Sequence, residues 1–107
     1  MELLVYKASA GSGKTFTLAV EYIKLLILTP RAYRQILAVT FTNKATAEMK
    51  ERILSQLSGI WQGDKDSDAY LKRIIAETGK PVEEVREAAK VALTNMLHDY
   101  SRFRVET

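Results

Sequence analysis

The sequence predicts an α/β domain with a short parallel sheet, and three observations support this fold class. Two short, continuous apolar runs, Leu3–Tyr6 and Ile36–Val39, are typical of strands that are covered on both faces. Helical patterns, with apolar residues every three or four positions, lie between and after these runs. A third stretch, which starts at Phe103, contains β-branched residues and alternates between apolar and polar side chains, as a strand does. Because strands alternate with helices, we expect parallel pairing through right-handed crossovers.

In the sequence, one helix is predicted before the second strand and another directly after it. One runs from Lys14 to about Leu28, and Pro30 ends it. It carries two apolar stripes, as expected of a helix that packs against both a sheet and other helices. The other follows Val39 and is amphipathic. Its apolar positions are Ala45, Met49, Ile53, Leu57 and Ile60.

The second half of the chain predicts a loop and a helical hairpin. Trp61–Asp68 is polar and turn-rich, which indicates a loop. Ala69–Thr78 predicts a helix that stops at Gly79, and Pro81 stands in the first turn of the next helix. One apolar face of that helix comprises Val82, Val85, Ala89, Ala92, Met96 and Tyr100. The expected order is therefore β-α-β-α-α-α-β.

Composition limits the class of protein. With 107 residues, 47% of them hydrophobic and 27% charged, the chain has the balance of one globular domain. The absence of cysteine excludes disulfides and Cys-based zinc sites. The longest apolar stretch, Leu25–Leu28, is far shorter than a membrane span, so we expect a soluble, cytoplasmic protein without a membrane partner. The net charge of +3 permits contact with a polyanion without requiring it.

A glycine-rich segment, ASAGSGKT at Ala8–Thr15, joins the first strand to the first helix. In such a loop the backbone N–H groups face inward and the helix N-terminus adds partial positive charge, which together make an anion site. Phosphate is the expected ligand. The strict phosphate-loop pattern is GxxxxGK[ST]; Gly13, Lys14 and Thr15 fit it, but Ala8 stands where the first glycine belongs.

Each residue type in this loop has a physical role. Gly11 and Gly13 allow backbone torsions and a close approach that a side chain would block. Lys14 is expected to reach the β- and γ-phosphates and the Thr15 hydroxyl to ligate Mg²⁺, which makes these two the candidate catalytic residues. The candidate nucleotide-binding residues are Ala8, Ser9, Ala10, Gly11, Ser12, Gly13, Lys14, Thr15 and Phe16. The alternative is a flexible turn that caps an ordinary helix, with Lys14 solvated.

A second segment, ILAVTFTNKATAEMKERI at Ile36–Ile53, runs from the second strand through TFTN into a helix. Thr42 or Asn43 is expected to cap that helix. Taken by itself, the segment is an ordinary strand-to-helix turn with Phe41 in the core. The phosphate loop alone does not distinguish a kinase, a GTPase or a motor, because one fold carries many functions.

Together, the two segments resemble motifs I and Ia of the UvrD-like superfamily 1 DNA helicases. In that family alanine commonly stands where Ala8 stands. ASAGSGKTFTLA resembles the RecB/AddA type, the beta subunit of exonuclease V, more than the UvrD or Rep type. Those types carry an adenine-reading glutamine segment ahead of motif I, and no such glutamine precedes Ala8. The closing YSRFRVET resembles the stretch before the family's next motif, so the resemblance covers nearly the whole chain.

The resemblance implies a P-loop NTPase (RecA-like) partial domain, three-layer, with a short parallel sheet. Residues 1–107 would be the N-terminal part of the first motor domain, with the P-loop at 8–15, motif Ia at 38–45 and a helical insertion at about 61–100. ATP and Mg²⁺ would bind the P-loop. The residues along the single-stranded DNA path would be Thr40, Phe41, Thr42 and Asn43. Phe41 has two possible roles, a platform for a base or a filler of the core.

The function that the resemblance implies is ATP binding within an ATP-dependent DNA helicase/exonuclease subunit that acts in double-strand break repair. The implied partners are single-stranded DNA, duplex ends and a second helicase-nuclease subunit. The acidic pair that holds Mg²⁺ and the arginine fingers are expected beyond Thr107, so we expect weak or no ATP hydrolysis by this chain alone. Two alternatives are a P-loop small-molecule kinase or other NTPase, and a docking role for the insertion helices.

Three further features have ordinary structural interpretations. Asp64, Asp66 and Asp68 are expected to be solvated surface residues rather than metal ligands. His98, near a helix end and without a second His or Cys nearby, is not expected to bind a metal. Trp61 is expected to pack against the core, and the alternative is an exposed ring on a DNA-binding face.

Overall fold

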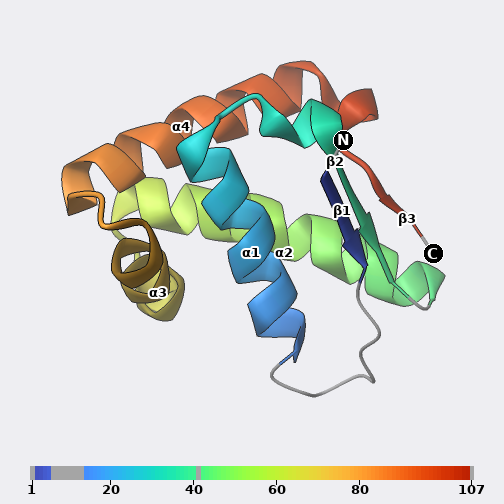
Figure 1. Cartoon of the computed structure of the whole chain (residues 1–107), viewed down its shortest axis with the longest axis horizontal. Helices are drawn as coiled ribbons and strands as arrows, with labels where there is room; N and C mark the ends of the chain where they lie inside the picture. The colour runs from blue at the N-terminus through green and yellow to red at the C-terminus, as the bar shows by residue number, and fades with distance from the viewer. Residues whose placement is uncertain (1, 6–13, 41, 107) are drawn as a thin grey trace.

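A computed structural model describes residues 2–5, 14–40 and 42–106, and its elements follow the predicted order (Figure 1). The strands are β1 (Glu2–Val5), β2 (Ile36–Val39) and β3 (Val105–Glu106). The α-helices are α1 (Lys14–Leu28), α2 (Asn43–Gln62), α3 (Asp68–Thr78) and α4 (Val82–His98). Short 3₁₀ helices are η1 (Ala32–Gln35), η2 (Lys65–Ser67) and η3 (Tyr100–Arg102).

The sheet is parallel, as predicted, with the strand order β1-β2-β3. Val5 pairs with Val39, and Ala38 pairs with Val105. Its burial differs from the prediction, because β2 alternates between buried and half-buried residues. Ile36 and Ala38 are buried with the helices, whereas Leu37 and Val39 are only half-buried. The helices therefore cover one face of β2 fully and the other only in part.

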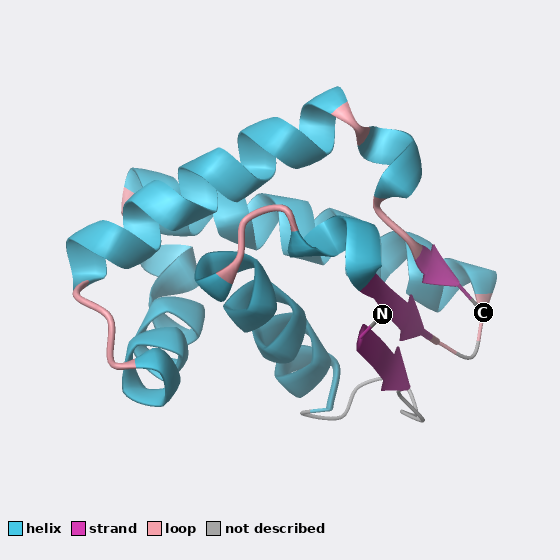
Figure 2. Cartoon of the chain, turned by 45° about the horizontal axis from the view of Figure 1, so that its top comes forward, coloured by secondary structure: helices cyan, strands magenta, loops and turns pink. Residues whose placement is uncertain are grey.

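The helices share one core with the covered face of the sheet (Figure 2). α2 packs along α4, and α1 contacts both of them. The ring of Tyr22 on α1 meets the ring of Phe103 edge-on, with 5.6 Å between centroids, so the first helix is joined to the approach to β3. The largest fully buried side chains are Tyr22, Tyr33, Phe103, Ile23, Leu26, Ile53, Leu57, Ile60, Ile74 and Met96. The predicted helical hairpin is thus part of the main core rather than a separate unit.

Two glycines end helices. Gly63 and Gly79 have φ values of 73° and 72°, in the left-handed region that glycine enters without steric cost. α2 continues to Gln62, two residues into the segment predicted as a loop, and η2 occupies part of the remainder. That prediction was wrong at its start, because Gly63 rather than the polar composition sets the end of the helix. Gly79 ends α3 where predicted.

Three aromatic or apolar side chains are more exposed than predicted. Trp61 has 37% of its surface exposed, and the Lys90 Nζ lies 5.8 Å from its ring centroid. Its expected packing against the core was wrong, since the last turn of α2 points this residue outward beside α4. Val82 and Tyr100 are exposed as well, because they lie at the ends of the predicted face, where α4 no longer meets its neighbours.

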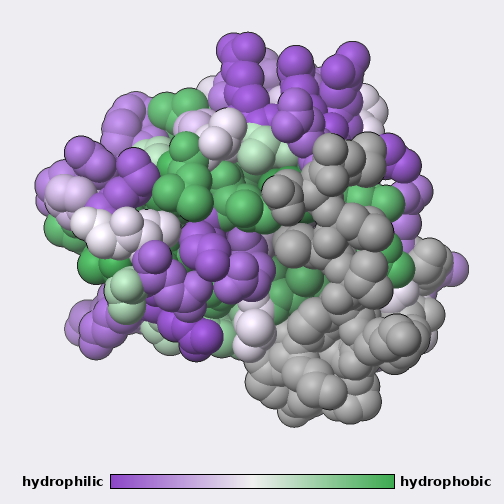
Figure 3. All heavy atoms as spheres, in the orientation of Figure 1, coloured by the Kyte–Doolittle hydropathy of each residue, from purple (hydrophilic) through white to green (hydrophobic). Residues whose placement is uncertain are grey.

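Charged residues join α1 to α3. The Lys24 Nζ lies 3.0 Å from carboxylate oxygens of both Glu21 and Glu77, and Arg73 also contacts Glu77. Hydrogen bonds from Arg73 and then Lys24 lower the pKa of Glu77. In the space-filling view hydrophilic residues stand along the top, over α4, and apolar residues lie below them where the helices meet (Figure 3). None of the helices in the described ranges combines the length and apolar character that crossing a bilayer requires.

We expect Ile53→Ala to destabilise the domain strongly. Ile53 is fully buried among the helices, and its truncation leaves a cavity that costs about 3 kcal/mol of unfolding free energy. Urea denaturation followed by circular dichroism measures this. Val91→Ala is the matched control, because Val91 is 39% exposed and its loss should cost no more than about 0.5 kcal/mol. Equal losses for the two variants would contradict the core described above.

Candidate functional site

The strands that lead into the two predicted motifs end at the same edge of the sheet. β1 and β2 are parallel and in register, with Val5 opposite Val39, so their carboxyl ends are neighbours. The chain leads from the first of these ends to the start of α1, and from the second to the start of α2 (Figure 2). In open parallel sheets this carboxyl edge is where ligands bind.

The predicted nucleotide-binding residues fall into two groups. Ala8, Ser9, Ala10, Gly11, Ser12 and Gly13 lie outside the described residues, as does Phe41. Lys14, Thr15 and Phe16 form the first turn of α1. The first four N–H groups of an α-helix have no acceptor within it, so α1 itself does not use the backbone donors of its first turn.

The side chain of Phe16 has a structural contact. Its ring packs against Tyr70 on α3, with 4.6 Å between centroids, and it belongs to the rim of the core. The Arg52 Nη1 in turn donates to the Tyr70 hydroxyl at 3.0 Å. The ring therefore packs the start of α1 against α3, and the Arg52–Tyr70 hydrogen bond extends this contact to α2.

The four α-helices differ in the charge of their first turns. α3 begins with Asp68, and α4 has Glu83 and Glu84 in its first turn, where a carboxylate stabilises the positive end of the helix dipole. α1 and α2 have no acidic residue there. Instead Lys14 and Lys44 occupy these turns. The two helices that begin at the carboxyl edge thus keep their positive N-terminal potential, which favours an anion.

Hydroxyl groups organise the start of α2. The Thr42 Oγ1 accepts a hydrogen bond from the Ala45 N–H at 3.0 Å, which confirms Thr42 as the N-cap and places Asn43 as the first helical residue. The hydroxyls of Thr40 and Thr46 lie 2.7 Å apart, and both contact the Thr42 carbonyl oxygen. Hydrogen bonds from Thr40, before the turn, and from Thr46, within α2, therefore both hold the Thr42 carbonyl.

Thr40 and its neighbours in the motif differ in accessibility. Thr40 is buried at 7% exposure, and its N–H donates to the Glu106 carbonyl at 2.7 Å, so β3 supports this turn. Thr42 and Asn43 are exposed at the carboxyl edge. Of the three described members of the predicted DNA path, two therefore face solvent, and Thr40 holds their backbone.

The sequence did not point to Thr46 or Glu106 as supports of the site. The sequence does contain a signal for Thr46. Threonines at 40 and 46 lie on either side of the N-cap Thr42, and a helical threonine can donate to the carbonyl oxygen four residues earlier. Glu106 contributes only a backbone carbonyl, which no side-chain pattern encodes.

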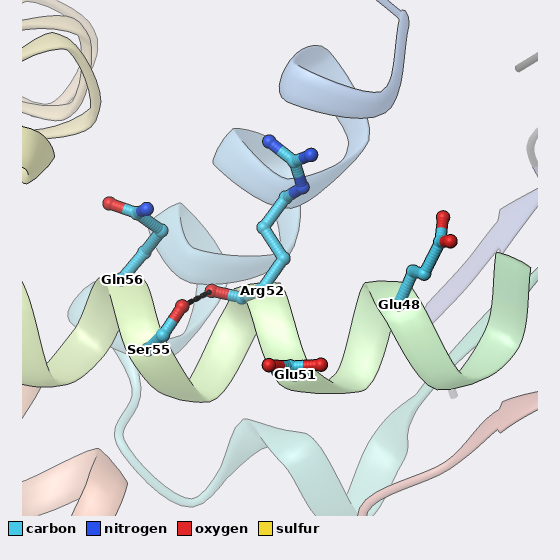
Figure 4. A pocket seen from close by; sticks show the side chains of 5 residues that line it. All are labelled: Glu48, Glu51, Arg52, Ser55 and Gln56. Carbon is cyan, nitrogen blue, oxygen red and sulfur yellow. Dashed lines mark hydrogen bonds between the residues drawn. The ribbon is translucent and has the colours of Figure 1, made fainter. Parts of the chain in front are cut away.

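A shallow cavity of about 360 Å³ lies along α2 and is lined by Glu48, Glu51, Arg52, Ser55 and Gln56 (Figure 4). Arg52, Glu48 and Gln56 rise from the same side of the helix in this view. The Gln56 Oε1 is buried without a hydrogen-bond partner among the described residues. Among residues 14–40 and 42–106, none of the predicted site residues lines this cavity.

The residues expected to be ordinary surface groups are exposed. Asp64, Asp66 and Asp68 are all exposed, and Asp64 caps η2 by accepting from the Asp66 N–H at 3.1 Å. His98 is exposed on α4, and its Nδ1 lies 2.8 Å from the Thr94 carbonyl oxygen. No group of three His, Cys, Asp or Glu residues that could hold a metal ion occurs in the part of the chain that the structure describes.

Comparison with known proteins identifies the class. The family model of the UvrD/REP helicase N-terminal domain matches residues 2–104, so the chain belongs to this family. The predicted resemblance to UvrD-like helicases is confirmed.

Individual relatives include both types of protein that the sequence resembled. Over 50 residues, 47% of this chain, it is 52% identical to the ATP-dependent DNA helicase UvrD1 of Mycobacterium leprae. Over 59 residues, 48% of this chain, it is 44% identical to the RecBCD enzyme subunit RecB of Escherichia coli. Over 72 residues, 67% of this chain, it is 36% identical to an ATP-dependent helicase/nuclease subunit of Alkaliphilus metalliredigens. The matched stretch covers only 6%, 5% and 6% of these relatives, respectively. No solved structure matches the chain significantly.

We expect Thr42→Ala to destabilise the start of α2. Loss of the capping oxygen leaves the Ala45 N–H without its acceptor and costs about 1 kcal/mol. Urea denaturation gives the global effect, and hydrogen exchange at Ala45 shows whether it is local. Ser55→Ala is the control, since the Ser55 hydroxyl donates to the Arg52 carbonyl oxygen in the middle of the same helix and caps no helix end. A cost no larger than that of Ser55→Ala would contradict the capping role.

Proposed function

We propose that this chain forms the ATP-binding part of an ATP-dependent DNA helicase/exonuclease subunit. One observation carries the proposal: two segments with helicase-like motifs reach the same edge of a parallel sheet, and both open into helices whose first turns lack acidic residues. Membership of the UvrD/REP helicase N-terminal domain family supports it.

The nucleotide would bind at the start of α1. The backbone N–H groups of the loop at 8–13 and of the first turn would surround the β- and γ-phosphates, and the ammonium group of Lys14 would neutralise their charge. Thr15 is half-buried at this turn, where a hydroxyl could serve as one ligand of Mg²⁺. This donor set suits Mg²⁺, which is commonly held by one or two protein oxygens together with phosphates and water. Bound Mg²⁺ would neutralise charge on the phosphate oxygens.

Single-stranded DNA would cross the carboxyl edge beside α2. Thr42 and Asn43 are exposed there and could contact phosphates through hydroxyl and amide groups. Phe41, between the rigid Thr40 and the N-cap, would stack on a base. Thr40 and Thr46 would act as positioning residues, because their hydroxyls hold the Thr42 carbonyl.

The finer parts of the proposal concern the whole protein. The chain would be the first part of a three-layer P-loop (RecA-like) motor domain, with motif Ia at 38–45 and α3 and α4 within an insertion at about 61–100. We place the protein with the RecB/AddA type in double-strand break repair in the cytoplasm, acting on duplex ends with a second helicase-nuclease subunit. No described feature favours a P-loop small-molecule kinase.

Hydrolysis would need more groups than this chain supplies. Phosphoryl transfer requires the developing charge to be neutralised from several sides, and here only the loop and the start of α1 contribute. We therefore expect this chain to bind ATP with little or no turnover, so binding rather than phosphate release is the informative measurement.

We expect Lys14→Ala to weaken Mg·ATP binding by about tenfold or more, since a charge-assisted contact to phosphate is lost. Titration with a fluorescent ATP analogue measures this dissociation constant. Lys65→Ala is the matched control, because it removes one exposed lysine from η2 and should leave the affinity unchanged. Equal affinities for the Lys14→Ala variant and the unmodified chain would rule out the proposed nucleotide site.

We expect Phe41→Ala to reduce binding of single-stranded oligothymidine by about tenfold, the loss of one stacked base. Fluorescence anisotropy at several salt concentrations measures it. Trp61→Ala is the control, since it removes an exposed aromatic ring at the other end of α2. If Phe41→Ala lowers the melting temperature while oligothymidine affinity stays the same, Phe41 is a filler of the core and not a base platform.

A further inference from the structure

A polar hollow lies at the opposite edge of the sheet from the candidate site. It has a volume of about 300 Å³ and is lined by Arg31, Tyr33, Arg34, Asn95, His98 and Asp99. η1 leads directly into Ile36, the first residue of β2, so the hollow is at the amino end of that strand. The carboxyl terminus of α4 forms its other wall (Figure 1).

The floor of this hollow is rigid. Tyr33 is buried at 1% exposure, and its hydroxyl donates to the Asp99 Oδ2 at 3.0 Å and lies 3.3 Å from the Asn95 carbonyl oxygen. The Arg34 Nε donates to the same Asp99 oxygen at 2.9 Å. Burial acts to raise the pKa of Asp99, but these hydrogen bonds and the nearby arginine charges outweigh it, and the pKa is lowered. The Asp99 carboxylate is therefore ionised, and it is already hydrogen-bonded to Tyr33 and paired with Arg34.

Positive charge exceeds negative charge around this carboxylate. Besides Arg34, the Arg102 Nε lies 3.8 Å from the Asp99 Oδ1. Arg31 lines the hollow and is exposed, and it takes part in none of the ion pairs found within residues 14–40 and 42–106. Two guanidinium groups thus pair with the Asp99 carboxylate, and a third, that of Arg31, lines the same hollow. Guanidinium groups are planar forks that recognise phosphate and carboxylate oxygens through paired N–H donors.

The chemistry of the hollow favours the backbone of a nucleic acid duplex. Its surplus of positive charge suits a phosphate within a polyanion. Of the two rings in its described lining, Tyr33 is buried, and the exposed imidazole of His98 is joined through its Nδ1 to the Thr94 carbonyl oxygen. The lining therefore lacks the series of aromatic rings on which successive bases of a single strand stack. Contacts that come from arginines without such a platform hold phosphates and read no sequence.

We propose that this hollow, with Arg31 and Arg34 as its principal donors, binds a backbone phosphate of double-stranded DNA. It is a second DNA contact, at the amino edge, separate from motif Ia at the carboxyl edge. The choice of DNA as the polyanion rests on the proposed function, whereas the phosphate chemistry rests on the hollow itself.

Two variants of the 107-residue chain test the site with a blunt 20-base-pair duplex as the probe. Arg31→Ala should weaken duplex binding by about tenfold and reduce the slope of log affinity against log salt by about one, as expected for one lost phosphate contact. Asp99→Asn removes the competing charge and retains a hydrogen-bond acceptor for Tyr33, so duplex binding should tighten by about threefold. A purely structural role for Asp99 would weaken binding instead.

The controls separate this proposal from the proposed function. Lys72→Ala removes one exposed cation from α3 and should change duplex affinity less than about twofold. Phe41→Ala should leave the effect of Arg31→Ala intact. Lys14→Ala and Phe41→Ala could leave the affinities for ATP and oligothymidine unchanged while Arg31→Ala still weakens duplex binding. That result would support the phosphate site in the hollow and contradict the proposed function.

Two results would overturn the proposal. One is an equal effect of Arg31→Ala and Lys72→Ala on duplex affinity. The other is a nuclear magnetic resonance titration in which the Nε–H signals of Arg31 and Arg34 shift with a glutamate-rich peptide and not with the duplex, which would assign the hollow to an acidic protein segment.

Discussion

The parallel pairing of β1 with β2 is the constraint on which the rest of the structure depends. Because Val5 lies opposite Val39, both strands end at the same level, and the connections to α1 and α2 leave the sheet from the same edge. β3 adds to this edge, since the Glu106 carbonyl accepts the Thr40 N–H. A register shift of one residue would turn the buried face of β2 outward.

The helical part of the chain supports both edges of this small sheet. α4 packs along α2 and contacts α1, and its buried face fills the space behind the sheet. Its carboxyl end reaches η1, where Tyr33 and Asp99 join residues that are 66 positions apart. The same helix thus stabilises the core and positions the polar hollow at the amino edge, so the two edges carry separate groups around one core.

Much of this architecture could be predicted because local patterns encode it. The apolar run Ile36–Val39 became β2 without change, and Lys14–Leu28 became α1, because continuous apolar strands and helical periodicity are local signals. Thr42 was one of two candidates for the cap, and the structure selects it. Local patterns did not predict Trp61, whose exposure depends on where α4 packs, or the supporting role of Thr46, which arises from hydroxyl geometry. The half-burial of one face of β2 could not be predicted either. An apolar residue gives the same sequence pattern whether or not another element covers it.

The central claim is that the start of α1 binds the phosphates of a nucleotide at the carboxyl edge. The most direct measurement is a nuclear magnetic resonance titration of the ¹⁵N-labelled chain with a magnesium complex of a non-hydrolysable ATP analogue. The account predicts that the largest amide shifts occur at residues 11–16, with smaller ones at 40–43. Shifts confined to the amino edge around Arg31 and Arg34, or no shifts at saturating analogue, would contradict it.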